Sequence, residues 1–94
     1  MPAYWIAHVD VSDAATYAQY AKAATSAIAA HGGRFLARGG RSVTLEGKGR
    51  ARNVVIEFPS LEAAEACYHS DAYQVALGFA HGVSVRDLVV VEGV

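Results

Sequence analysis

The sequence His69-Ser70-Asp71 brings together the three residue types of a hydrolase triad. In a triad the histidine lies between the nucleophile and the carboxylate, and three consecutive residues cannot point their side chains along one such line. A simpler interpretation is that Ser70 caps a helix with Asp71 in its first turn, because serine accepts from first-turn amides and a carboxylate favours that end. His69 keeps two interpretations: a partner for the last carbonyls of the preceding helix, or a pocket base that titrates near neutral pH.

Two further titratable residues lie on expected strands. Glu57 stands in the apolar run Val54–Phe58, where a half-buried carboxylate needs a partner, so we expect a salt bridge to an arginine of the adjoining strand, with a catalytic role as the alternative. His8 lies in the first apolar segment. It is either a hydrogen-bonded core histidine or, if its face lines an enclosed space, a functional group.

Tyrosines mark one face of a long alanine-rich segment. Tyr17, Tyr20, Ala24, Ala27 and Ile28 recur at intervals of three and four residues, which is the spacing of one helix face. Such a stripe is typical of a core. Buried tyrosine hydroxyls still require hydrogen-bond partners, so the same stripe offers candidates for a pocket.

The charges are few and unevenly placed. The chain has 94 residues, a formal net charge of −1 and 53% hydrophobic residues, which favours neither nucleic acid nor an anionic membrane as a partner. Six of the eight basic residues nevertheless lie between positions 34 and 52: Arg34, Arg38, Arg41, Lys48, Arg50 and Arg52. This cluster is either a solvated rim or a lip that contacts an anion. Aromatic residues do not alternate with the basic ones, as a surface that stacks single-stranded bases would require.

Other classes of protein find no support in the sequence. Cys67 is the single cysteine, so no intramolecular disulfide or multi-cysteine metal site can form. No apolar run reaches the roughly 18 residues of a membrane span, and the first residues do not resemble a signal peptide. No histidine pair has metal-ligand spacing, and the glycines do not form a nucleotide loop. We therefore predict a cytoplasmic protein without metal or cofactor.

The order of the expected elements indicates a single domain over residues 1–94. Aromatic and β-branched runs predict strands, and caps and glycines delimit the helices. The expected elements are a strand 3–9, a helix 14–31, a strand 34–38 continued by 42–45, a turn 47–49, a strand 53–58, a helix 61–68, a second helical piece after 70 and a strand 86–92. This is the β-α-β-β-α-β order of the ferredoxin-like α+β fold, with the helices on one face of a four-stranded antiparallel sheet.

The expected strands are apolar on both faces. Leu88 and Val90 point to one side while Val89 and Val91 point to the other, so the face without helices is also hydrophobic. The simplest cover is the same sheet of a second copy. We predict a homodimer through the open sheet face that buries more than ~1,200 Å² in total.

Several motifs together resemble the family known as domain of unknown function 1330, within the dimeric α/β-barrel superfamily. They are Gly-Gly-Arg-Phe-Leu-Ala-Arg-Gly-Gly at 32–40, Val-Val-Ile-Glu-Phe-Pro-Ser at 54–60, Tyr-His-Ser at 68–70 and Val-Glu-Gly at 91–93. The resemblance implies a ferredoxin-like protomer that forms a dimeric α/β barrel. It implies little about activity, because superfamily relatives include cofactor-independent monooxygenases, small isomerases and ligand-binding regulatory domains.

Two hypotheses for the function follow. The first is a cofactor-independent acid/base or oxygenase-type reaction on a small organic molecule, in a pocket lined by Tyr20, Arg38, Glu57 and His69. Arg38 would hold a carboxylate or enolate, His69 would move a proton and Tyr20 would orient the substrate. The second is a dimer that binds or senses a small apolar or anionic metabolite without changing it. Further candidate ligand contacts are Tyr17, His8 and Tyr73.

Overall fold

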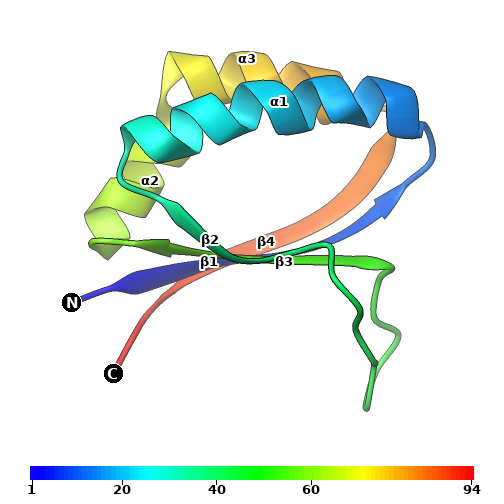
Figure 1. Cartoon of the computed structure of the whole chain (residues 1–94), viewed down its shortest axis with the longest axis horizontal. Coiled ribbons are helices and arrows are strands. Elements are labelled where there is room, and N and C mark those ends of the chain that lie inside the picture. The colour runs from blue at the N-terminus through cyan, green and yellow to red at the C-terminus, as the bar shows by residue number, and fades with distance from the viewer.

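The computed structural model describes all 94 residues and has the predicted element order. The elements are β1 (Ala3–Val11), α1 (Ala14–Ala30), β2 (Arg34–Arg38), β3 (Arg52–Phe58), α2 (Leu61–His69), α3 (Asp71–Ala80) and β4 (Ser84–Glu92). The four strands form one antiparallel sheet in the order β2-β3-β1-β4. The helices all lie on one side of this sheet (Figure 1). The predicted ferredoxin-like fold is confirmed, including the division of its second helix into α2 and α3.

The two faces of the sheet differ because side chains alternate along each strand. In β1, Trp5 and Val9 point toward the helices and are each 1% exposed, whereas His8 points to the open face. Trp5 is the centre of the aromatic core: its ring stacks on Phe58 at 5.6 Å and meets the edge of Tyr73 at 5.1 Å. The helix-facing side of the sheet is therefore the core, and the opposite face has no cover from this chain.

Short polar residues begin the helices. Asp13 caps α1 by accepting from the Thr16 amide at 3.1 Å. Ser60 caps α2 through the Ala63 amide, and Ser70 caps α3 through the Tyr73 amide. The predicted structural role of Ser70 is thus confirmed, and the Tyr73 side chain at the start of α3 is fixed against the sheet.

One predicted element is wrong. Residues 42–45 do not continue β2, and residues 39–51 contain neither strand nor helix. After the Gly39 amide donates to the Asn53 carbonyl at 2.9 Å, the chain leaves the sheet. Gly39 has φ of 67°, and the Arg52 guanidinium occupies the space that a β-carbon would need there. This left-handed turn ends the ladder, so the pairing that the apolar residues at 42–45 suggested does not form.

No helix in the structure has both the length and the hydropathy required to cross a membrane. No group of three or more His, Cys, Asp and Glu side chains is placed to hold a metal ion. Cys67 is buried in α2, where burial raises the pKa of its thiol to about 11 and makes it a poor nucleophile.

Candidate functional site

A cavity of about 30 Å³ lies between α1 and the helix-facing side of the sheet. Eleven of its fourteen lining residues are hydrophobic, and the other three are all arginines: Arg38, Arg52 and Arg86. No carboxylate and no histidine lines it. The cavity is therefore an apolar space whose only formal charges are positive.

Arg86 lies at the inner end of this space, on β4. Its Nη2 donates to the Tyr20 hydroxyl at 2.7 Å and to the Tyr73 hydroxyl at 3.3 Å, and its guanidinium carbon lies 4.6 Å from the centre of the Tyr20 ring. Its Nε is buried and has no hydrogen-bond partner. A buried donor without an acceptor lowers the stability of the protein, most of all on a charged group. The chain supplies no acceptor for this nitrogen.

The two tyrosines come from different helices and meet above Arg86. Their hydroxyl oxygens are 2.7 Å apart, with Tyr20 on α1 and Tyr73 on α3. Burial is the main cause that raises the pKa of the Tyr20 hydroxyl far above its ordinary value, and burial also raises the pKa of Tyr73. Both phenols are therefore neutral hydrogen-bonding groups at physiological pH, and neither is a base.

Arg38 and Arg52 line the outer part of the cavity, on β2 and β3. Arg38 is exposed, donates to Thr25 Oγ1 of α1 at 2.7 Å and stacks on the Phe35 ring at 4.2 Å. Arg38 thus connects β2 to α1 at the mouth through one side-chain hydrogen bond. All three ion pairs of the protein involve other arginines, so the three at the cavity have no carboxylate partner.

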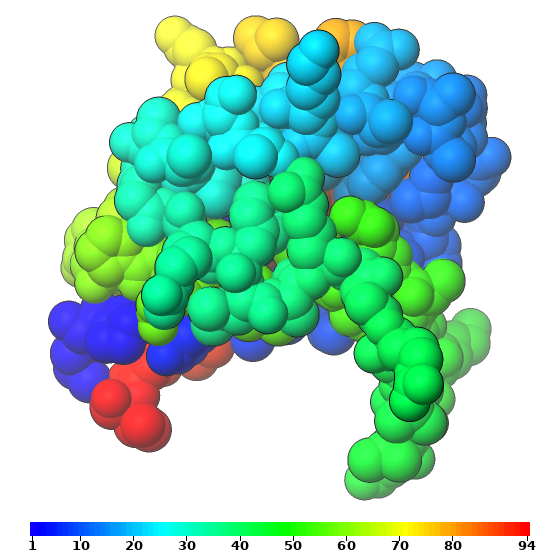
Figure 2. All heavy atoms as spheres, viewed as in Figure 1, coloured from blue at the N-terminus to red at the C-terminus, as the bar shows by residue number.

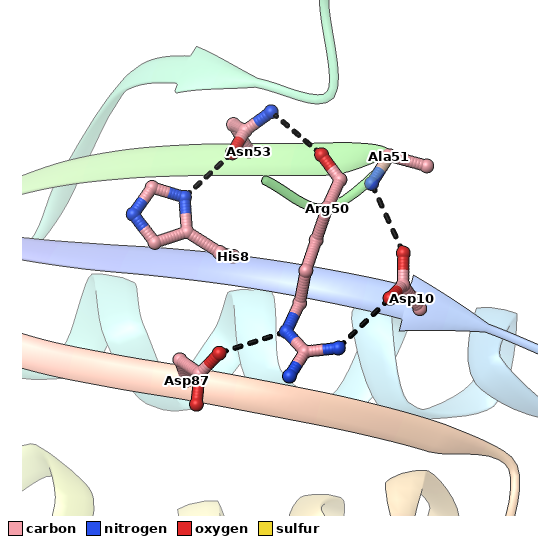
Figure 3. A network of polar contacts seen from close by, with 6 residues as sticks. All are labelled: His8, Asp10, Arg50, Ala51, Asn53 and Asp87. Carbon is pink, nitrogen blue, oxygen red and sulfur yellow. Dashed lines mark hydrogen bonds and ion pairs between the residues drawn. The ribbon is translucent and has the colours of Figure 1, made fainter. Parts of the chain in front are cut away.

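The open face of the sheet carries a different polar network (Figure 3). Arg50 donates to Asp10 at 2.8 Å and to Asp87 at 2.7 Å, and the Ala51 amide donates to the other oxygen of Asp10 at 3.0 Å. These bonds lower the pKa of Asp10, the Ala51 amide being the largest cause. The guanidinium of Arg50 thus has two carboxylate partners within the chain.

His8 belongs to this open face and not to the core. Its Nδ1 lies 2.6 Å from Asn53 Oδ1, and the side chain is exposed. The expectation of a buried core histidine is corrected: alternation along β1 puts His8 on the side opposite Trp5. His8 could contact a ligand only if another molecule covered the open face of the sheet.

The structure brings only some of the predicted site residues together. Tyr17, Tyr20 and Arg38 line the cavity, and Tyr73 reaches it through its hydroxyl. Glu57 instead accepts from Arg34 at 2.8 Å and from the Tyr4 hydroxyl at 3.4 Å, which confirms the expected salt bridge between neighbouring strands.

His69 ends α2 away from the cavity. It is exposed, and its ring packs edge-on against Tyr68 at 5.3 Å, above a shallow depression shared with Leu88 and Val90. The predicted convergence of His69 and Glu57 with Tyr20 and Arg38 on one pocket is not found in the protomer.

Arg52 and Arg86 were absent from the predicted site. The signal for Arg86 was available in the sequence, because it stands two and four residues before Leu88 and Val90 and therefore shares their helix-facing side. A single arginine at a core-facing strand position, with no acidic residue at the paired positions, marks this kind of site. Arg86 is paired in register with the apolar Val9.

The element order and the antiparallel sheet order β2-β3-β1-β4 define a ferredoxin-like α+β fold. Residues 2–94 match the family described as Domain of unknown function (DUF1330), and the chain belongs to that family.

Two solved structures show the same fold. The first is the RPA0582 protein of unknown function from Rhodopseudomonas palustris, with TM-score 0.81 and 17% identity over 99% of this chain and 82% of that chain. The second is SnoaB, a cofactor-independent oxygenase from Streptomyces nogalater, with TM-score 0.66 and 10% identity over 98% of this chain and 92% of that chain. At these identities the likeness concerns the fold alone. No curated protein matches the chain.

Proposed function

We propose that this protein binds a small organic anion, a carboxylate or an enolate, in the cavity between the sheet and α1. The observation that carries the proposal is the lining: apolar and aromatic residues, three arginines and no acidic group. Guanidinium groups bind carboxylates through short, charge-assisted hydrogen bonds, and these bonds strengthen where water is excluded.

Arg86 is the proposed anchor for the anionic group. It is held by two neutral phenols instead of a counter-ion, and its buried Nε retains an unused donor. A bound carboxylate or enolate oxygen would satisfy that donor and offset the cost of the buried charge. Arg38 and Arg52 would add positive potential at the mouth.

The rest of the cavity favours a ligand with an apolar or aromatic body. Trp5, Tyr17, Phe35 and Ile56 supply its walls. A volume of about 30 Å³ accommodates one or two water molecules, so a larger ligand must widen the cavity. Arg38 is the residue best placed to move, because it is exposed and its side chain makes a single hydrogen bond, to Thr25.

The direct test is the thermal unfolding of the protein with benzoate and with benzamide, which has the same ring without the charge. We expect millimolar benzoate to raise the Tm and benzamide to leave it unchanged. Arg86→Gln should weaken benzoate binding about 10- to 100-fold, the range for a lost hydrogen bond to a charged group. Arg34→Gln is the matched control, because Arg34 pairs with Glu57 outside the cavity.

A second variant protects this test against loss of folding. Arg38 is exposed, so Arg38→Gln leaves the core intact and should still weaken benzoate binding. Equal shifts with benzoate and benzamide, or a benzoate shift that survives both Arg86→Gln and Arg38→Gln, would contradict the proposal.

An oxygenase-type reaction on the bound anion is the second candidate function. It is favoured by the convergence of Arg86, Tyr20 and Tyr73, whose donors would stabilise the oxygen of an enolate. SnoaB, which shares the fold, is described as a cofactor-independent oxygenase. No side chain at the cavity is a base near neutral pH, so the substrate would have to be acidic enough to arrive as the anion. Oxygen uptake that depends on a 1,3-diketone or an acidic phenol, and that Arg86→Gln abolishes, would select this candidate over binding alone.

We also propose that the protein is a homodimer through the open sheet face. Val85 and Val89 are each 56% exposed and Val91 is 48% exposed on that face. The chain exposes 5786 Å², whereas a monomer of 9.9 kDa is expected to expose about 5,200 Å². This excess of about 590 Å² is near the lower limit of the roughly 600–1,000 Å² that each partner of a specific interface buries. A sedimentation mass of one subunit at micromolar concentration would contradict the dimer.

A further inference from the structure

A segment that the cavity does not use projects from the molecule. Residues 39–51, which we call the arm, extend away from the helix layer and beyond the open face of the sheet (Figures 1 and 2). Two apolar side chains of the arm, Val43 and Leu45, are 78% and 87% exposed. They add to the exposed valines of β4 on the same side of the molecule, and an extended apolar surface of this kind marks an interaction site.

Side-chain hydrogen bonds hold the base of the arm, whereas Val43 and Leu45 further along it are exposed. Arg50 is held between Asp10 and Asp87, and Asn53 donates to Ser42 Oγ at 3.1 Å and to the Arg50 carbonyl at 3.3 Å. Figure 3 shows how this network attaches the end of the arm to β1 and β4. The arm is therefore a directed extension of the open face.

The arm and the open face together form a groove. Its volume is about 860 Å³, and of its lining residues only Val43 and Leu45 are hydrophobic. The floor of this groove, near His8 and Asp87, continues along the strands into the exposed valines of β4. A molecule the size of this sheet that covers those valines would therefore also reach the groove beside the arm.

We propose that the arm clasps a second copy of this chain, with Val43 and Leu45 packed against the partner protomer. This inference rests on the proposed dimer. The surface excess of the chain reaches the lower limit for one side of a specific interface, and the arm stands on the side that the second copy would occupy. Because a two-fold interface uses the same patch twice, each protomer would hold the other with its own arm.

The charges of the open face agree with this exchange. Arg41, Glu46 and Lys48 of the arm have no ion pair in their own chain, which leaves a surplus of one positive charge there. Glu92 at the opposite end of the sheet has no ion pair either. A two-fold rotation that reverses the strand direction brings the arm of one protomer to the Glu92 end of the other.

The ends of the arm also continue directly into Arg38 and Arg52, so the clasp adjoins the mouth of the cavity.

Sedimentation equilibrium of three proteins tests the clasp: wild type, the double variant Val43→Asp with Leu45→Asp, and the control Val75→Asp. Val75 is 68% exposed on α3, far from the open face, so it matches the arm residues in type and exposure. We expect the arm variant to weaken the dimer roughly tenfold or more, because two apolar contacts are replaced by buried charges. The control should stay within twofold of wild type.

Digestion of the wild-type protein with trypsin provides a second measurement that needs no variant. Arg41 and Lys48 are exposed cleavage sites in the arm. We expect cleavage at both to be slower above the dimer dissociation constant than at high dilution.

The outcomes separate the proposals. A wild-type dimer that the arm variant leaves unchanged, with cleavage independent of concentration, overturns the clasp and leaves the sheet-face dimer standing. A wild-type monomer overturns both. Neither result affects the anion site, which the benzoate test examines separately.

Discussion

Arg50 and Arg86 lie on opposite faces of the same sheet and have opposite electrostatic surroundings. Arg50 contacts two carboxylates, those of Asp10 and Asp87, and attaches the arm to the sheet. Arg86 contacts two neutral phenols and keeps one buried donor without an acceptor. The same residue type thus completes a structural network on one face and leaves its charge uncompensated on the other.

A structural arginine differs from one that binds a ligand in whether the protein supplies its counter-charge. A charge removed from water is costly unless the protein supplies its partner, so an unpaired, partly buried guanidinium is a feature that packing alone does not explain. Arg50 needs nothing further, whereas an anion would complete Arg86.

The largest expected effect concerns the core face. Trp5→Ala should lower the free energy of unfolding by about 3–5 kcal/mol, because it empties the centre of the aromatic cluster. Ile6→Ala, one residue further on the open face, should cost about 1 kcal/mol or less in the monomer. Urea unfolding at a dilution where the protein is monomeric measures both. Equal losses would contradict the assignment of the two faces.

Removal of each arginine should have different consequences for stability. Arg86→Met removes an uncompensated charge while Tyr20 and Tyr73 keep their mutual hydrogen bond, so the free energy of unfolding should stay within about 1 kcal/mol of wild type. Arg50→Met leaves Asp10 and Asp87 close together without a cation and releases the arm, so its Tm should fall. Thermal unfolding of the two variants at neutral pH provides the comparison. A large loss for Arg86→Met with none for Arg50→Met would reverse the proposed roles.

The smallest expected effect is the pH dependence of the Arg50 network. The Ala51 amide and Arg50 lower the pKa of Asp10 below its ordinary 3.8. A carboxyl whose pKa is lowered by folding stabilises the protein above its unfolded value, and this stability is lost as the pH falls through the folded value. The Tm of wild type should therefore fall below about pH 3.8, and Asp10→Asn should lose less Tm over the same interval. Identical acid limbs for the two proteins would show that Asp10 does not couple to folding.

Local signals in the sequence were sufficient for most of the fold. Ser60, Ser70 and the glycines set the ends of the helices, and the alternation of β1 and β4 gave the two faces. The arm was not predicted, because Val43 and Leu45 have the composition of a strand. Strand formation requires a partner with free hydrogen-bonding groups, and the chain turns away from β3 at Gly39. That outcome depends on tertiary geometry, which the sequence pattern of the segment does not contain.

The site was predicted less completely than the fold. Helix periodicity places Tyr17 and Tyr20 toward the sheet, and both line the cavity. The reactivity of His69 favours a place in the site, yet the residue lies exposed at the end of α2. The residue type of Arg86 predicts the opposite of what the structure shows, because arginine on a strand normally implies an exposed position. The informative property of Arg86 is its position among core-facing residues of β4. This position indicates an anion site only once the structure shows that no carboxylate lines the cavity.

The most direct test of the central claim is a crystal soaked in sodium bromide and measured at the bromine absorption edge. Bromide is small enough for the cavity as it stands, and its anomalous signal distinguishes it from water. We predict a bromide ion beside Arg86, between the sheet and α1, and none at Arg50, whose charge Asp10 and Asp87 already compensate. Bromide at surface arginines with an empty cavity would contradict the claim that the unpaired charge of Arg86 forms an anion site.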